Sequence, residues 1–193
     1  MAASPTRTGG TSTSKRSDAV RNSKAVLDAA AAVFVESGVN APIRQIAARA
    51  GVGMATVLRH YPDRLDLVTA VYRHQVDECA EAAPRLLKAA ESPSRALRDW
   101  VDLFIEFLVT KHGLAEVVVS DTSGIGVLHR YFIDALLPAC GSLIDASVAA
   151  DEMRADVAPL TLLRAVGNLC VGSEQVPRSE TSLIVHIFLD GLS

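Results

Sequence analysis

Apolar residues recur at three- and four-residue steps through most of the chain, the spacing that places them on one face of an α-helix. Strict alternation of apolar and polar residues, which marks a half-buried strand, is almost absent. Glycine and proline interrupt the pattern and divide it into segments. The pattern therefore predicts an all-α protein with helices near residues 18–37, 42–50, 53–60, 65–81, 93–111, 127–150, 157–171 and 180–189.

Residues 42–67 are the segment around which the rest is organised, because they contain two helices too short to hold a core of their own. Ile43 and Ile46 lie on one face of the first helix. Gly51 is expected to end that helix with a positive φ angle, and Pro62 stops the second helix. Two short helices joined by a glycine-containing turn form the helix-turn-helix pattern.

The second helix of such a pair lies in the DNA major groove. Spacing alone leaves an ordinary helical hairpin as an equal alternative. The side chains favour DNA, because they combine donors for phosphate oxygens with small or flexible groups that can approach base edges. Thr56 is the first choice for a base-edge contact. The predicted DNA-binding residues are Arg44, Gln45, Gly53, Met54, Ala55, Thr56, Arg59, His60 and Arg64.

Charge is distributed unevenly along the chain, although the net charge of the 193 residues is only −3. Residues 1–64 carry nine lysine or arginine side chains against four acidic ones, whereas residues 65–193 carry ten against eighteen. A basic first part and an acidic second part are expected when one domain meets phosphate and the other faces solvent.

Two groups of residues resemble the tetracycline-repressor (TetR) family of bacterial regulators. They are Ile46-Ala47-Ala48-Arg49-Ala50-Gly51-Val52 and Thr56-Val57-Leu58-Arg59-His60-Tyr61-Pro62-Asp63-Arg64. The resemblance covers about residues 20–72. Leu58 stands where the family commonly has a tyrosine, and Met54 where lysine or arginine is frequent. The resemblance implies a DNA-binding headpiece, a connecting helix, and a second domain with a ligand pocket.

Three segments are predicted from these patterns. Residues 1–18 are rich in serine, threonine and glycine and form a disordered basic tail, either a solvated leader, which we favour, or an arm for the minor groove. Residues 19–64 form a three-helix, helix-turn-helix DNA-binding domain. Residues 65–193 form a helical ligand-binding and dimerisation domain.

The last two predicted helices carry more apolar surface than one chain of this size is expected to cover. Residues 183–189 are apolar on nearly all sides apart from His186. A second copy of the chain is the simplest cover, and burial within one larger core is the alternative. The predicted dimer interface comprises Leu160, Leu163, Val166, Leu183, Ile184, Ile187 and Phe188.

The most aromatic segment is the helix predicted at residues 93–111. Its aromatic side chains are either core residues, the safer interpretation for each of them, or walls of an effector pocket of the kind that the family resemblance implies. Few charges lie on the inner faces, so the expected effector is a small apolar or neutral molecule. The candidate lining residues are Trp100, Phe104, Phe107, Phe132 and Asn168.

Other chemistry is not indicated by the sequence. The five histidines repeat no known ligand motif, and neither glycine pair continues into a phosphate-binding loop, so we predict no catalytic site, cofactor or metal. Cys79, Cys140 and Cys170 are expected to be reduced, mostly buried thiols of a cytoplasmic protein. No uninterrupted apolar run has the length of about 20 residues that a membrane helix needs, and no membrane partner is expected.

The predicted function is therefore DNA-binding transcriptional regulation, not catalysis. A ligand-released repressor that binds a palindromic double-stranded operator as a homodimer is the first hypothesis. A ligand-dependent activator is one alternative. A dimeric ligand-binding or interaction protein with weakened DNA binding is the other, since Leu58 and Met54 depart from the family pattern.

Overall fold

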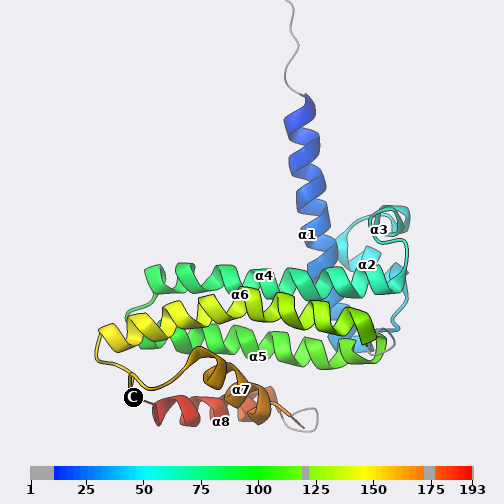
Figure 1. Cartoon of the computed structure of the whole chain (residues 1–193). Coiled ribbons are helices and arrows are strands. Elements are labelled where there is room, and N and C mark those ends of the chain that lie inside the picture. Colours follow the sequence, from blue (N-terminus) through cyan, green and yellow to red (C-terminus); the bar gives the residue numbers. More distant parts are fainter. Residues whose placement is uncertain (1–10, 119–121, 172–176, 193) are drawn as a thin grey trace, which may run out of the picture.

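The computed structural model describes residues 11–118, 122–171 and 177–192, and the described residues are helical with short connections (Figure 1). This confirms the predicted all-α fold class. The helices are α1 (Thr11–Ser37), α2 (Ile43–Ala50), α3 (Met54–His60), α4 (Arg64–Ala89), α5 (Pro93–Val118), α6 (Thr122–Ala149), α7 (Pro159–Leu169) and α8 (Arg178–Asp190).

Helices α1, α2 and α3 form a small body at one end of the molecule (Figure 1). Its core contains Val26 and Phe34 from α1, Ile46 from α2 and Val57 from α3, each at most 2% exposed. These side chains occupy the apolar positions that the helical spacing indicated. Gly38 ends α1 with φ +79°, a conformation that costs glycine little.

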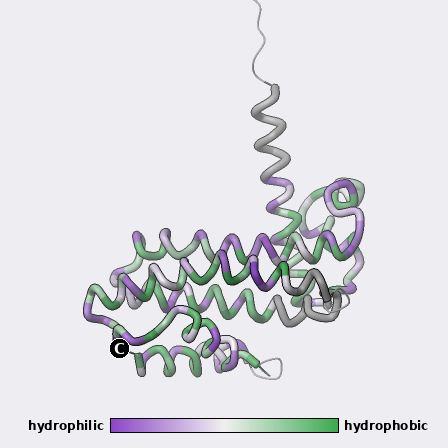
Figure 2. Tube along the Cα trace, in the orientation of Figure 1, coloured by the Kyte–Doolittle hydropathy of each residue, from purple (hydrophilic) through white to green (hydrophobic). Residues whose placement is uncertain are grey.

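Helices α4, α5 and α6 run side by side and form the second body, with α7 and α8 packed beneath α5 (Figure 1). Hydrophobic and hydrophilic residues are interspersed along these long helices, and the hydrophobic ones recur about once per helical turn (Figure 2). Each helix therefore turns an apolar face to its neighbours. Asp63 caps α4 as predicted, because its Oδ1 accepts the Asp66 N–H at 2.7 Å. Ser92 likewise accepts the Arg95 N–H at 3.3 Å at the start of α5.

Helix α1 begins earlier than predicted. Residues 11–18 were assigned to the disordered tail, but they are the first residues of α1, whereas residues 1–10 lie outside the described part. The segment after Gly10 contains no proline or glycine until the helix ends, and Lys15 and Arg16 are good helix formers. It therefore extends a helix already nucleated by packing of its later turns.

Helices α4 and α5 are longer than predicted. Pro84 was expected to end the connecting helix, but α4 continues through it to Ala89. Buried Ala82 and Ala83 anchor α4 before the proline, and half-buried Leu86 and Leu87 pack against the core after it, so tertiary packing offsets the missing N–H. Helix α5 likewise continues through Gly113, since one glycine weakens a helix by only about 1 kcal/mol.

Helix α6 also begins before the predicted position and stays continuous through Pro138. Residues 126–149 of α6 form the one helical segment within the described ranges that is long and apolar enough to cross a membrane. This segment belongs to the bundle, where α6 contacts α4, α5 and α7.

Candidate nucleic-acid interface

The turn between α2 and α3 has the geometry that its sequence predicts. Gly51 adopts φ +67° and ψ +26°. Its N–H donates to the Ala48 carbonyl at 3.3 Å, and the Val52 N–H donates to the Ala47 carbonyl at 3.0 Å. These two bonds are those of a Schellman motif, which satisfies the last carbonyls of a helix. The turn therefore fixes how α3 leaves α2.

Helix α3 buries one side chain fully and exposes the opposite face. Val57 is 0% exposed and anchors α3 in the core. Helical geometry places Ala55 and Arg59 on the side away from Val57, and both are exposed. Thr56, the first choice for base contact, is half-buried. The structure thus favours Arg59 over Thr56 as the side chain that reaches outward.

Other predicted DNA-binding side chains are also exposed. Arg44 and Gln45 lie at the start of α2, and Met54 and Leu58 lie one helical turn apart on α3, 52% and 41% exposed. Exposed aliphatic groups on such a helix can contact thymine methyl groups. The exposed face of α3 therefore offers both apolar and cationic contacts.

One side-chain contact fixes α3 within the headpiece, and another joins the headpiece to α4. The Tyr61 hydroxyl, just after α3, lies 3.0 Å from the Ser23 hydroxyl of α1. The Arg64 guanidinium donates to the Val39 carbonyl at 2.6 Å, and this side chain is half-buried. Arg64 was predicted to bind DNA, but its described contact joins the start of α4 to the α1–α2 turn. It therefore links the orientation of α4 to the headpiece.

The predicted pocket residues are mostly brought together, as a packed cluster. Phe104 lies 5.7 Å from Trp100, 6.2 Å from Phe107 and 6.0 Å from Phe132 between ring centroids. All four are at most 7% exposed, so they fill space with one another. Asn168 does not join them, because its side chain is exposed on α7. Helix register points it outward, so Asn168 as a lining residue stays a prediction without support from this cluster.

Two cavities lie beside α4. One, of about 150 Å³, is lined by Cys79, Leu103 and Phe107 and reaches the aromatic cluster through Phe107. Its outer wall is polar and comprises Gln75 and the charged side chains of Glu78, Arg85 and Glu106. The other is a groove of about 400 Å³ between α1, α4, α5 and the start of α8. Four carboxylates line this groove, from Asp28, Glu36, Glu78 and Glu106.

The predicted dimer interface is divided by the structure into buried and exposed residues. Leu163 and Val166 are 4% and 0% exposed because they pack into the core of their own chain, so they do not belong to the apolar surface that a partner could cover. Leu160 and Phe188 are half-buried. Leu183, Ile184 and Ile187 form an apolar face on α8 and are 59%, 42% and 61% exposed.

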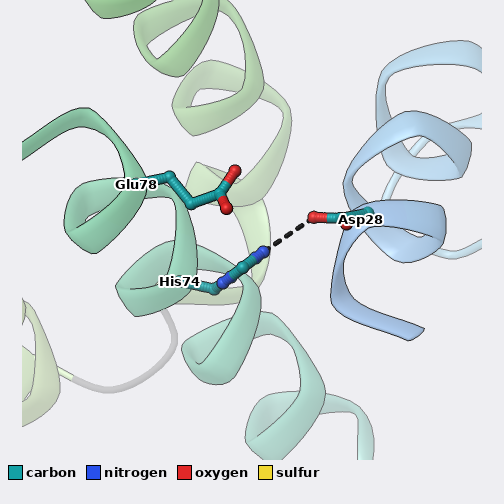
Figure 3. A group of neighbouring side chains, drawn as sticks. All are labelled: Asp28, His74 and Glu78. Carbon is teal, nitrogen blue, oxygen red and sulfur yellow. Dashed lines mark hydrogen bonds and ion pairs between the residues drawn. The ribbon is translucent and has the colours of Figure 1, made fainter. Parts of the chain in front are cut away.

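A polar cluster that the sequence analysis missed joins α1 to α4. His74 Nε2 lies 2.7 Å from Asp28 Oδ1 (Figure 3). Lys24 Nζ pairs with Asp28 at 3.4 Å and also with Glu78. The hydrogen bond to Glu78, with the charges of both carboxylates, raises the pKa of Lys24 above its ordinary value. The four-residue spacing of His74 and Glu78 was a usable signal, but only the fold brings Asp28 to them.

The three cysteines are free and buried, as predicted. Burial raises the pKa of Cys79 and of Cys140 to about 12, and it also raises the pKa of Cys170. A thiol with a raised pKa is almost wholly neutral at pH 8, and only the thiolate reacts with alkylating agents.

We therefore expect iodoacetamide at pH 8 to alkylate Cys79 and Cys140 of the native protein on the order of a thousandfold more slowly than in urea. Peptide mass spectrometry over time measures both rates. Equal rates in native protein and in urea would contradict the burial of these thiols.

Two family models match the chain. The model described as bacterial regulatory proteins, tetR family, matches residues 26–71. The model described as transcriptional regulator SbtR-like, C-terminal domain, matches residues 92–193, more than half of the chain.

Individual relatives are similar over different lengths. The HTH-type transcriptional repressor LfrR of Mycolicibacterium smegmatis is 41% identical over 82 residues, which are 42% of this chain and 43% of LfrR. The HTH-type transcriptional activator FasR of the same organism is 32% identical over 84 residues, 43% of this chain and 38% of FasR. The matched region thus spans less than half the length of either curated relative.

Solved structures are similar over nearly the whole chain. The crystal structure of the TetR transcriptional regulator SCO0520 from Streptomyces coelicolor has a TM-score of 0.78 and 30% identity, covering 88% of this chain and 97% of that one. That of LfrR from Mycobacterium smegmatis in complex with proflavine has a TM-score of 0.59 and 27% identity, covering 88% and 95%.

Proposed function

This chain belongs to the TetR family of bacterial regulatory proteins, and from that premise we propose that it is a ligand-released transcriptional repressor that binds a two-fold DNA operator as a homodimer. Repression would follow from covering a promoter. We also propose that the protein is located in the cytoplasm and catalyses no reaction.

The observation that carries the DNA-binding part is the presentation of α3. A seven-residue helix anchored by one buried valine exposes Ala55 and Arg59 outward, with Met54 and Leu58 beside them. Such a helix contributes little to the core, but its exposed face has the size and the donors needed in the major groove. The basic residues of the first 64 positions supply attraction to phosphate.

Dimerisation would use the apolar face of Leu183, Ile184 and Ile187 on α8. A two-fold pair presents two α3 helices, which suits two half-sites in successive major grooves about 34–36 Å apart or at a multiple of that distance. A ligand that favours dimers with a different headpiece spacing would weaken DNA binding by its differential affinity for the two forms.

The effector would bind in the second domain near Phe107 and be apolar or neutral. The cavity there measures about 150 Å³, whereas drug-sized ligands need roughly 300–1,000 Å³. A ligand would therefore have to separate side chains of α4 and α5. Because Arg64 connects the start of α4 to the headpiece, such movement has a physical route to α3. The proflavine complex of LfrR supports a small-molecule effector as a general expectation.

Activation in place of repression remains the second candidate, because one relative is named an activator. Promoter activity with and without the gene distinguishes the two. A dimeric ligand-binding or interaction protein with weakened DNA binding is the third, favoured by exposed Leu58 and Met54 where the family commonly has polar or basic side chains.

The test of the proposed function is fluorescence-anisotropy binding of the purified full chain to its own upstream DNA, titrated with salt. We expect site-selective binding. The logarithm of the association constant should fall steeply as the logarithm of the salt concentration rises, because phosphate contacts release counterions. Weak binding equal to that of unrelated DNA would contradict a local operator and favour the third candidate.

Arg59→Ala is expected to weaken operator binding about 10-fold and to lower the salt slope by about one, because an outward guanidinium on α3 neutralises phosphate or contacts a base. The matched control is Arg95→Ala, an exposed arginine of α5 paired with Asp99, which should leave both quantities unchanged. The same anisotropy titration measures both variants. An unchanged slope and affinity in Arg59→Ala would remove Arg59 from the interface.

A further inference from the structure

We propose that Asp28, His74 and Glu78 form a binding site for a divalent transition-metal ion such as Zn²⁺, which bridges α1 of the headpiece and α4. The site itself is independent of the proposed function. Its consequence for DNA binding rests on that function.

The three side chains are placed to share one ion. His74 and Glu78 are one helical turn apart on α4 and therefore lie on the same face. Asp28 faces them from α1 (Figure 3). One ligand atom from each residue lies within 4.8 Å of those of the other two. Donors around Zn²⁺ at about 2.0–2.2 Å are roughly 3.4 Å apart, so rotations of the carboxylate side chains, both about half exposed, suffice to complete the site.

Charge at the cluster favours a divalent ion over the present arrangement. Among the described residues, the two carboxylates pair with one ammonium group, that of Lys24. With a neutral imidazole, this leaves one negative charge uncompensated. A divalent ion between Asp28 and Glu78 would balance both carboxylates, while Lys24, which is about half exposed, can turn into solvent.

The surroundings have room for an ion with its water ligands. All three residues line the groove of about 400 Å³, together with Glu36, Glu106 and Arg178. This volume leaves room for water ligands beside the protein ligands. Arg49 pairs with Glu36 and Arg178 with Glu106, whereas Asp28 and Glu78 are the groove carboxylates closest to the imidazole. Gln75 lines the same groove, and its buried Oε1 atom accepts no hydrogen bond from the described residues. An acceptor without a donor is costly when buried, and a water molecule in the groove can donate to it.

The donor set indicates which class of ion would bind. Imidazole nitrogen suits Zn²⁺ and neighbouring transition metals, whereas Mg²⁺ and Ca²⁺ prefer oxygen ligands alone. Three protein ligands leave a position open, so water would complete the coordination. We expect affinity to rise from Mn²⁺ through Co²⁺ to Zn²⁺, with Mg²⁺ binding weakest.

The site lies between the headpiece and the second domain, so an ion bound there would act on the orientation of the headpiece. Asp28 lies within the segment matched by the DNA-binding family model, and His74 and Glu78 lie beyond its end at residue 71. An ion held by all three would fasten α1 to α4 in the arrangement described here. If this arrangement is the one that binds DNA, the ion would raise DNA affinity, and if it is not, the ion would lower it. By thermodynamic linkage, DNA would change the affinity for the ion by the same factor.

The experiment is isothermal titration of the full-length, tag-free protein with Zn²⁺ and with Mg²⁺ in the absence of DNA. We expect one Zn²⁺ per chain. His74→Gln, Asp28→Asn and Glu78→Gln should each lower Zn²⁺ affinity at least about 10-fold. Lys24→Met should raise it several-fold, because it removes the competing ammonium. All four positions are at the surface or half-buried, and circular dichroism verifies that each variant is folded.

The matched control is His186→Gln. His186 is another half-buried histidine beside a carboxylate, with Nε2 3.1 Å from Asp102 Oδ1, and its removal should leave Zn²⁺ binding unchanged. Absence of Zn²⁺ binding, or binding unaffected by His74→Gln and Lys24→Met, would overturn the site. These outcomes are independent of any DNA measurement and therefore of the proposed function.

Regulation is tested separately by measuring DNA affinity with and without Zn²⁺. A change in the wild type that disappears in His74→Gln supports coupling through this site. An equal DNA affinity in both conditions would overturn the coupling.

Discussion

Trp100→Ala is expected to lower the free energy of unfolding by about 3–5 kcal/mol, the range for removing a buried aromatic side chain. Trp100 is 0% exposed and lies 5.7 Å from Phe104 in a stacked arrangement. Its indole N–H donates to the Cys79 carbonyl at 2.8 Å, which joins α5 to α4. The substitution therefore leaves a cavity and removes a hydrogen bond between the two central helices of the second domain.

Urea denaturation followed by circular dichroism at one fixed protein concentration measures this effect, because stability of an oligomer depends on concentration. Leu103→Ala is the matched control, since Leu103 lies on the same helix but is 38% exposed, and it should cost less than about 1 kcal/mol. Trp100→Phe should fall between the two. A loss below about 1 kcal/mol in Trp100→Ala would contradict the packed aromatic cluster.

If the protein is the proposed dimer, Ile187→Glu is expected to convert it to a monomer and to weaken operator binding on the order of 100-fold or more. Ile187 is 61% exposed and lies one helical turn after Leu183 and Ile184, so its replacement does not disturb the core of the chain. Two copies of the face related by a two-fold axis would bring the introduced carboxylates together without a compensating charge. Loss of the dimer removes the benefit of binding two half-sites at once.

Sedimentation velocity at micromolar concentration measures the oligomeric state, and anisotropy measures the DNA affinity. Val127→Glu serves as control, because Val127 is 57% exposed but lies on α6. We expect this control to keep both the dimer and the operator affinity. A dimeric Ile187→Glu protein with unchanged DNA affinity would place the interface elsewhere.

Local sequence signals predicted the headpiece well. Gly51, Pro62 and Asp63 act on their nearest neighbours, through a left-handed backbone conformation, a blocked helix and a side-chain cap, and none of these needs a distant partner. The apolar spacing likewise predicted that Ile46 and Val57 are buried. The same signals misplaced some helix ends, as at Pro84, where packing on both sides outweighs the local preference.

The amino-acid sequence by itself determined the all-α class, the helix-turn-helix and the apolar excess of the last helices, because helical periodicity, caps and breakers are properties of short segments. Only the tertiary structure decided which of these apolar residues are buried and which stay exposed. Val166 and Ile187 both fit a helical apolar face, but Val166 packs into the core and Ile187 points to the surface. The tertiary structure also decided that Asp28 meets His74 across 46 residues. Such contacts depend on how whole helices pack, and no short segment encodes that alone.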